Sequence, residues 1–155
     1  MKFVKLDSPI GPLSIVRSEK GICSVNFYHM IESTELTLDE QDALLQKAAV
    51  QLSQYFNRER HVFDLTLDIK GTLFQENVWR ALCSIPFGKT VSYQEIAVMC
   101  GNHKAVRAVG QANKRNPVPI IIPCHRVIGK NKSMTGYSGK EIDKKMRLLQ
   151  LEGAL

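Results

Sequence analysis

Three short motifs set the points at which helices can begin in this chain. In each, a Ser or Thr is followed three residues later by Glu or Gln, so the two side chains can bond each other's backbone amides at a helix N-terminus. The motifs are Thr37 with Glu40, Thr72 with Gln75 and Ser92 with Glu95. Apolar residues at helical spacing follow each motif. These three motifs therefore predict one helix start in the first half of the chain and two of the helix starts in the second.

The first half of the chain predicts a small α/β domain. Short β-rich runs at Phe3–Leu6, Leu13–Val16 and Ile22–Tyr28 are separated by turn residues and predict an antiparallel meander. The first capping motif predicts a helix over about 38–57 that packs on this sheet. An alternating run at 61–67 predicts a further strand. Core packing accounts for the apolar residues here, so we expect this half to have a supporting role.

The second half predicts a helix-turn-helix. Ser92 opens a short helix that ends at Gly101, and Asn102 can cap another helix that runs to about Arg115. Two short helices joined by a glycine-containing turn have helix-turn-helix spacing. The second helix carries Lys104, Arg107 and Gln111 on one face. An ordinary helical hairpin is the alternative.

Charge is divided unevenly between the two halves. Residues 1–69 carry 7 Lys and Arg against 10 Asp and Glu, a net −3, whereas residues 70–155 carry 14 against 5, a net +9. No carboxylate occurs between Glu95 and Glu141. The cations in that stretch are Lys104, Arg107, Lys114, Arg115, Arg126, Lys130, Lys132 and Lys140. A basic surface without acids is typical of proteins that bind polyanions, nucleic acid first among them; a face that serves only solubility is the alternative.

Composition excludes several other classes of protein. No apolar run approaches the roughly 18 residues of a membrane span, and the charged start is unlike a signal peptide, so we expect a cytoplasmic protein with no membrane partner. The four cysteines are widely separated and lack zinc-ligand spacing, so we expect free thiols, no metal and no cofactor. Cys23 and His29 could form a metal site only with distant partners.

One stretch of the second half combines reactive side chains with an apolar run. Residues 120–128 read IIIPCHRVI, an expected strand that runs through Pro123 into Cys124, His125 and Arg126. A thiolate is the nucleophilic form of cysteine, and cationic or hydrogen-bonding groups near the sulfur favour it. Cys124 is therefore a candidate nucleophile, with His125 and Arg126 as candidate activators. A buried structural cysteine at the end of a strand is the alternative.

Several motifs of the second half, taken together and in order, resemble one family. They are SYQEIA at 92–97, AVRAVGQANKRNP at 105–117, PCHRVI at 123–128 and GYSG at 136–139, and residues 71–93 extend the match. These motifs resemble the O6-alkylguanine-DNA alkyltransferases, also called methylated-DNA-protein-cysteine methyltransferases. The first half is similar to the family only in length and style. The resemblance implies a monomeric DNA repair protein whose partner is double-stranded DNA carrying O6-alkylguanine, and it leaves open whether O4-alkylthymine is also accepted.

The resemblance implies a fold as well. It is an α+β protein with a small N-terminal α/β domain, built on an antiparallel ribonuclease H-like sheet, over residues 1–69. A mostly helical C-terminal domain, similar to a winged helix-turn-helix, covers residues 70–155. The first domain would support the second, which would bind DNA and carry the alkyl acceptor.

By resemblance, Cys124 accepts the alkyl group irreversibly, so that each molecule acts once. In the family a histidine takes the thiol proton through water and a glutamate orients the histidine. These positions fall on His125 and Glu152. A bridging water or a local twist of the chain is needed because adjacent side chains of a strand point to opposite faces. Arg126 is then left with structural support.

The other implied residues act on a flipped-out base, since guanine inside a duplex cannot reach the thiol. Arg107 would fill the vacated space, and Tyr93 would contact the flanking phosphate and the base. The small residues Ala105 and Gly110 fit close approach of the helix to the minor groove. The residues expected at the substrate pocket are Val127, Tyr137, Ser138 and, bracing the turn, Asn116.

Two positions depart from the family pattern. Lys132 and Lys140 stand where glycine is common. Because a non-glycine residue disfavours positive φ, we expect the loops there to differ in shape, which affects the range of alkyl groups accepted.

Two other functions fit parts of the sequence. A non-enzymatic relative that only binds damaged DNA would keep the helix-turn-helix, but relatives of that kind lack the cysteine that is present here as Cys124. A cysteine hydrolase would use a Cys and His pair, but it needs no helix-turn-helix. The alkyltransferase is the interpretation that uses every motif.

Overall fold

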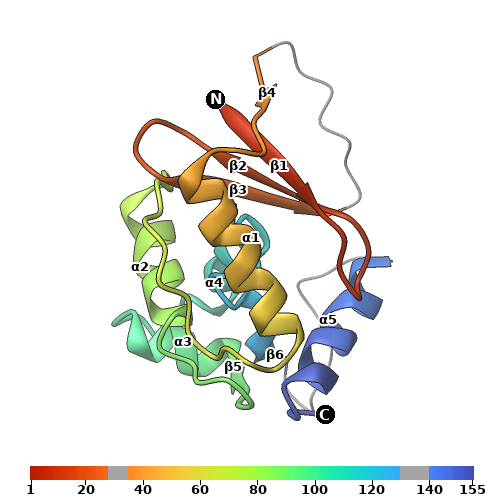
Figure 1. Cartoon of the computed structure of the whole chain (residues 1–155). Coiled ribbons are helices and arrows are strands. Elements are labelled where there is room, and N and C mark those ends of the chain that lie inside the picture. The colour runs from red at the N-terminus through yellow and green to blue at the C-terminus, as the bar shows by residue number, and fades with distance from the viewer. Residues whose placement is uncertain (28–34, 130–139) are drawn as a thin grey trace. The chain divides into compact units, whose positions relative to one another are not determined.

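The computed structural model describes residues 1–27, 35–129 and 140–155, without the side chains of 140–142. The chain divides into two compact units, Met1–Ile69 and Lys70–Leu155 (Figure 1). In the described part of the chain, no helix has both the length and the apolar character needed to cross a membrane.

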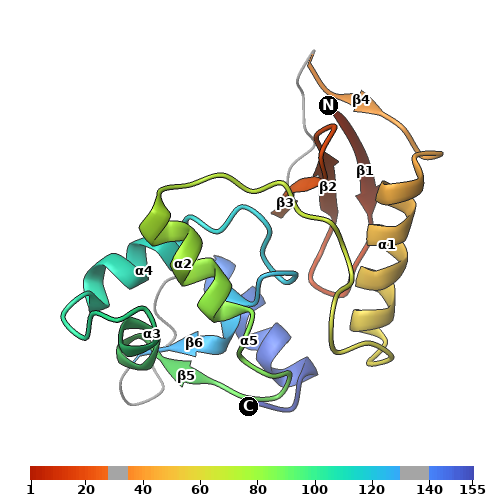
Figure 2. The same ribbon diagram turned by 90° about the vertical axis from the view of Figure 1, so that its left-hand side faces the viewer.

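The first unit is built on a four-stranded sheet with the order β3-β2-β1-β4. The strands are β1 (Lys2–Leu6), β2 (Leu13–Arg17), β3 (Ile22–Phe27) and β4 (Thr37–Leu38). The first three pair antiparallel, so the expected meander is confirmed, and β4 adds a short parallel edge beside β1. Helix α1 (Ala43–Phe56) packs against β1, β2 and β3, with Leu45, Ala48, Leu52 and Tyr55 fully buried (Figure 2).

Helix α1 begins later than the sequence predicts. Thr37 and Glu40 do not form a capping box, because the amides of Thr37 and Asp39 donate to the Met1 and Phe3 carbonyls across the parallel pairing with β1. Asp42 is the cap instead, and its carboxylate accepts from the Leu45 amide at 2.9 Å.

The predicted strand over 61–67 is also wrong. Only Leu67 forms a bridge there, with Ile22 of β3. The backbone of Asp64 is held by the buried amide of Gln51 on α1, which accepts from the Asp64 amide at 2.9 Å and donates to its carbonyl at 3.0 Å. A side chain of the helix therefore supplies the hydrogen bonds that a neighbouring strand would have supplied.

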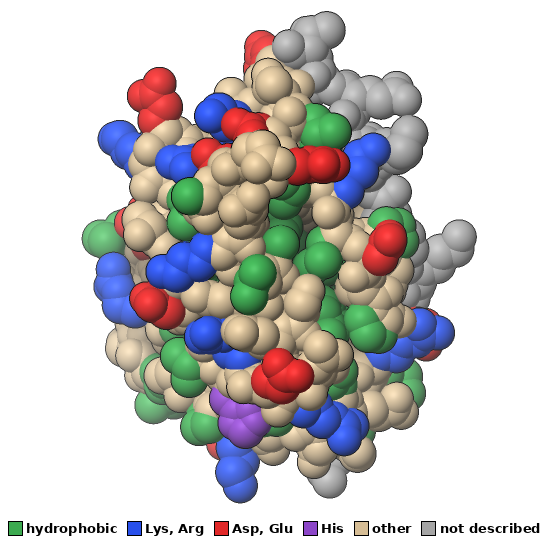
Figure 3. Space-filling model, in the orientation of Figure 1, with side chains coloured by type: hydrophobic (Ala, Val, Ile, Leu, Met, Phe, Trp, Pro, Cys, Tyr) green, Lys and Arg blue, Asp and Glu red, His purple; other side chains and the backbone are tan. Residues whose placement is uncertain are grey.

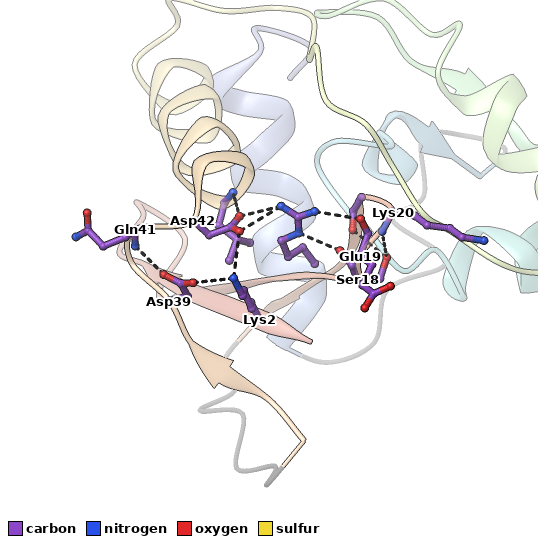
Figure 4. A network of polar contacts seen from close by, with 10 residues as sticks. Lys2, Ser18, Glu19, Lys20, Asp39, Gln41 and Asp42 are labelled. Atoms are coloured by element: carbon purple, nitrogen blue, oxygen red, sulfur yellow. Dashed lines mark hydrogen bonds and ion pairs between the residues drawn. The ribbon is translucent and has the colours of Figure 1, made fainter.

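Asp42 also joins the start of α1 to the sheet. The Arg17 guanidinium of β2 donates to both Asp42 oxygens, at 3.1 and 3.2 Å, and Lys2 of β1 pairs with Asp39 at 3.0 Å (Figure 4). Arg17 in turn donates to the carbonyls of Ser18 and Glu19. The Leu45 amide, aided by Arg17, holds the pKa of Asp42 below its ordinary value.

We predict that Asp42→Ala lowers the free energy of unfolding by about 1–2 kcal/mol, the usual cost of losing an N-cap. Asp42→Asn should lower the free energy of unfolding by a smaller amount at neutral pH, because the amide oxygen can still cap the helix. Because folding lowers the pKa of Asp42, its carboxylate stabilises the fold at pH values above the ordinary pKa of 3.8. This contribution is lost as the pH falls through the pKa of Asp42 in the folded protein. In acid, the free energies of unfolding of both variants should therefore lie closer to that of the unsubstituted protein. Urea unfolding at several pH values measures this, and equal losses for both variants at neutral pH would contradict it.

The second unit is mostly helical. Its elements are α2 (Leu73–Leu82), β5 (Val91–Ser92), α3 (Tyr93–Met99), α4 (Val106–Lys114), a 3-10 turn (Cys124–Arg126), β6 (Val127–Ile128) and α5 (Lys140–Leu151). Both predicted capping boxes are present, at Thr72 with Gln75 and at Ser92 with Glu95. Helices α3 and α4 pack on each other and on α2, which is the predicted helix-turn-helix (Figures 1 and 2).

The start of α4 differs from the sequence prediction. Asn102 does not cap this helix; its side chain accepts from the Lys104 amide at 3.1 Å and forms a tight turn ahead of it. Ala105 is the N-cap residue and makes no side-chain cap. The turn of the motif therefore uses the asparagine that was expected to open the helix.

The apolar stretch ahead of Cys124 is a series of turns, so the predicted strand is wrong. Ile120 has φ of 74°, which no strand residue adopts, and the Ile122 amide donates back to the Val118 carbonyl. Only a bridge between Pro119 and Ile122 is present. Beyond the cysteine, β6 pairs in parallel with β5. The sequence also predicts a strand at 135–137, which could pair with 127–128 as a hairpin wing beside the helix-turn-helix. Residues 135–137 lie outside the described residues.

Candidate active site

Cys124, His125 and Arg126 form one buried turn of 3-10 helix, and they are 4%, 0% and 5% exposed. A 3-10 helix has three residues per turn, so successive side chains leave it about 120° apart. The strand argument for separating Cys124 from His125 therefore does not apply, yet the two side chains still start in different directions.

The carboxylate of Glu152, at the end of α5, is the centre of the polar contacts around this turn. His125 Nε2 lies 2.7 Å from Glu152 Oε2, and both side chains are fully buried. Arg126 donates to the same carboxylate from Nε at 2.8 Å and from a terminal nitrogen at 3.0 Å. Its other terminal nitrogen donates to the Ile85 carbonyl at 2.7 Å. The structure therefore brings together His125 and Glu152, which the resemblance implied, and it joins Arg126 to the same carboxylate.

Burial sets the protonation state of His125. Desolvation lowers the pKa of His125, although Glu152 opposes the shift. A neutral ring that donates from Nε2 to an ionised Glu152 carries its lone pair on Nδ1. That nitrogen is buried and has no hydrogen-bond partner among the residues described. His125 is thus held as a neutral base with one free basic nitrogen, which is the form a proton acceptor needs.

Lys145 on α5 is a second buried charge at this site, and the sequence analysis did not find it. It is fully buried, and its Nζ donates to the Val127 carbonyl at 2.6 Å. Burial lowers the pKa of Lys145 to about 8, while an interaction with Cys124 raises it and so offsets part of the effect. A signal for it was present, since Lys145 precedes Leu148, Leu149 and Glu152 at i+3, i+4 and i+7 and so shares their buried face.

Two asparagines hold the backbone on either side of the cysteine. Asn116 donates to the Ile122 carbonyl at 2.8 Å and accepts from the Val118 amide at 3.0 Å. Asn113, on the buried side of α4, donates to the Cys124 carbonyl at 3.3 Å. The resemblance implied a bracing role for Asn116, whereas no motif of the sequence pointed to Asn113.

The outer side of α4 is the cationic surface. Its exposed residues, with those just before and after the helix, are Lys104, Arg107, Ala108, Gln111, Lys114 and Arg115. Tyr93, the first residue of α3, is 8% exposed, and a Cβ on Gly110 would lie 3.9 Å from its ring. Ala105 and Gly110 are half-buried. In contrast, the face drawn in Figure 3 mixes basic and acidic side chains.

The other expected residues are placed only in part. Val127 is fully buried beside the turn. Tyr137, Ser138 and Lys132 lie outside the described residues, as does the side chain of Lys140. The described side chains contain no group of three or more His, Cys, Asp or Glu that could hold a metal ion, and His29 is not among them.

A buried cysteine, a neutral histidine held by a carboxylate, and a cationic helix-turn-helix in one unit define a class: a nucleic-acid-binding protein with a nucleophilic cysteine. Comparison with known families makes the class specific. Residues 73–154 match the DNA-binding domain of 6-O-methylguanine DNA methyltransferase, and residues 1–69 match its ribonuclease-like domain. The chain belongs to the 6-O-methylguanine DNA methyltransferase family.

Individual relatives are similar along nearly their whole length. A methylated-DNA–protein-cysteine methyltransferase of Methanosarcina barkeri is 47% identical over 98% of this chain and 97% of that protein. The constitutive one of Bacillus subtilis is 44% identical over 97% and 94%. The crystal structure of Mycobacterium tuberculosis OGT in complex with DNA has a TM-score of 0.89 and 43% identity, and the match covers 99% of this chain and 94% of that one.

We predict that the stability contributed by Lys145 depends on pH. A lysine whose pKa is lowered to about 8 on folding, from 10.5, binds fewer protons when folded, so stability rises with pH between these two values. Relative to Lys145→Met, the unsubstituted protein should gain up to roughly 3 kcal/mol across this range, at about 1.4 kcal/mol per pKa unit.

Denaturant unfolding at pH 7, 8, 9 and 10.5 measures the difference. Lys89→Met, which removes an exposed lysine, is the control and should track the unsubstituted protein. A constant difference between Lys145→Met and the unsubstituted protein over this range would contradict the lowered pKa of Lys145.

Proposed function

We propose that this protein repairs DNA by transferring the alkyl group of O6-alkylguanine to Cys124 in a single, irreversible turnover. The observation that carries the proposal is the contact of His125 with Glu152 next to the buried cysteine. The names of the relatives, methylated-DNA–protein-cysteine methyltransferases, support the reaction. The DNA in the crystal structure of the Mycobacterium tuberculosis relative supports duplex DNA as the partner.

The proposed chemistry moves one alkyl group and one proton. The thiol of Cys124 gives its proton to the free Nδ1 of His125 through a bridging water, as in the family. The sulfur attacks the alkyl carbon, a C–S bond forms, and the bond from that carbon to O6 breaks with its electron pair leaving on the guanine. The guanine anion takes up one proton from water and becomes neutral, and the imidazolium of His125 returns its proton to water, so the protons balance. A thioether remains on Cys124.

Glu152 has two effects in this scheme. By accepting from Nε2 it selects the tautomer of His125 that leaves Nδ1 basic, and it stabilises the imidazolium that forms when the proton arrives. Arg126 donates two hydrogen bonds to the same carboxylate and balances its negative charge. The mechanism includes no group that removes an alkyl chain from sulfur, so the protein is spent after one event.

The substrate base has to leave the duplex, because Cys124 is 4% exposed. Arg107, exposed on α4, fills the vacated space, and Tyr93 contacts the base and the neighbouring phosphate. The protein acts as a monomer in the cytoplasm. The wide separation of the four cysteines along the chain supports a reducing compartment.

We predict that a duplex containing O6-methylguanine adds the mass of one methylene unit, a methyl in place of the thiol hydrogen, to the peptide that carries Cys124. Transfer should stop at one equivalent per protein molecule, and Cys124→Ser should abolish it. Cys83→Ser removes an exposed cysteine and should leave transfer unchanged. Peptide mass spectrometry with a radiolabelled methyl group measures both the site and the stoichiometry.

The two alternative functions predict different results in the same experiment. A protein that only binds lesions would retain the duplex without any change in mass. A hydrolase would turn over repeatedly and leave the cysteine unmodified at the end. Either result would refute the alkyltransferase.

We predict that Arg107→Ala slows transfer from duplex DNA at least tenfold while transfer from the free base O6-benzylguanine stays within about twofold, because only the duplex requires a base to be extruded at a cost of a few kcal/mol. Arg115→Ala is the matched control, since it removes another exposed cation at the end of α4. It should weaken DNA binding with little effect on the rate at saturating DNA. If Arg107→Ala slowed transfer from both substrates equally, Arg107 would not be the residue that fills the space left by the base.

A further inference from the structure

The inner side of α4 carries a polar group that the proposed mechanism does not use. Asn113 is 1% exposed, and its amide nitrogen donates to the Cys124 carbonyl at 3.3 Å. The outer side of the same helix carries the exposed Arg107 and Gln111. A single short helix therefore contacts the backbone of the nucleophile on one side and presents the DNA-facing residues on the other.

Stability alone does not explain an amide at this position. The Cys124 carbonyl can accept only from the NH2 end of the side chain, so the oxygen of Asn113 points elsewhere, and in the described part of the chain it has no hydrogen-bond partner. A buried acceptor without a partner costs about 1–3 kcal/mol. An apolar side chain would avoid this cost, and residues that break a packing rule without a gain in stability are concentrated at functional sites.

The fold of α4 has other anchors. The indole nitrogen of Trp79 donates to the Ala112 carbonyl at 2.8 Å, and Val109 and Ala112 are buried in the unit. Asn116 holds the chain just beyond the helix through the Ile122 carbonyl. The bond from Asn113 is distinct from these because it ends on the nucleophilic residue itself.

The carbonyl of Cys124 also accepts from the Val127 amide, the bond that closes the 3-10 turn. Two donors from different directions therefore fix the peptide plane that follows the cysteine. On the other side of Cα, the Cys124 amide donates to the Ile122 carbonyl at 2.8 Å. Because the peptide planes before and after Cys124 are both held, the direction of its Cα–Cβ bond is fixed, and this restricts where the sulfur can lie. In-line attack on a carbon is sensitive to such placement, and a displacement of about 1 Å can cost about a hundredfold in rate.

We propose that Asn113 is a positioning residue for alkyl transfer, one that fixes Cys124 to α4 so that the sulfur keeps a set place relative to the helix that contacts DNA. This inference rests on the proposed function. Asn113 acts through the backbone of Cys124, and no contact with the substrate is assigned to it.

The test uses the full chain with Asn113→Leu, which keeps the branched shape of the side chain and removes its hydrogen bonds. Gln51→Leu is the matched control, because it removes a buried amide that also holds backbone groups but lies in the first unit. Three quantities are measured with a duplex containing O6-methylguanine: the affinity for DNA, the rate constant at saturating DNA, and the final number of methyl groups per protein molecule.

For Asn113→Leu we expect a rate constant at saturating DNA that is tenfold to about a hundredfold lower, DNA affinity within about twofold, and a final yield that still reaches one methyl group per molecule. For Gln51→Leu we expect an unchanged rate constant. A single-turnover protein separates the two kinds of role, since a merely structural defect lowers the fraction of molecules that react and leaves the rate of the remaining ones unchanged.

An unchanged rate constant for Asn113→Leu, or a lower final yield at an unchanged rate, would overturn the inference. Should Asn113→Leu not fold, Asn113→Ala is measured in the same way and decides by the same criteria. If the unsubstituted protein transfers no methyl group, the proposed function fails and this inference fails with it, and that outcome is distinguished because it does not depend on any variant.

Discussion

The carboxylate of Glu152 is the contact on which the site depends. It accepts from His125 and twice from Arg126, so residues 26 and 27 positions apart are joined at a point from which water is excluded. Charge-assisted hydrogen bonds of this kind are strong, yet the desolvation of the ions offsets much of their energy. Their main effect is therefore on geometry: the end of α5 is attached to the 3-10 turn, and the orientation of the imidazole is fixed.

Local signals in the sequence predicted the fold well where the chain closes its own hydrogen bonds. The capping boxes at Thr72 and Ser92 are local, and both were correct. The one at Thr37 was wrong because β1, far away along the chain, takes the amides that the box would have satisfied. The run before Cys124 was misjudged for another reason. Its apolar residues indicate that the run is buried, but a buried run can be a strand or a series of packed turns.

The residues of the candidate site show the same difference between local signals and contacts made only in the folded protein. Cys124 and His125 stand out by residue type and by adjacency, so they could be proposed without a structure. Glu152 is separated from them by an entire helix, and only the family resemblance connected it to His125. Lys145 and Asn113 carried helical spacing that marks a buried face, but spacing does not tell which buried polar residue reaches a particular backbone carbonyl. That information exists only once the helices are packed.

The conformation of Ile120 shows that the shape of the chain before Cys124 depends on the surrounding fold. A β-branched residue at φ 74° costs about 1–3 kcal/mol and persists only where surrounding packing enforces it, and Ile120 is 1% exposed. The nonapeptide IIIPCHRVI would not keep this shape by itself, and it would lack the carboxylate that orients its histidine. The surroundings that the proposed reaction of Cys124 requires are thus absent from the motif and arise with the tertiary structure. When the second unit unfolds, an ordinary thiol is what remains.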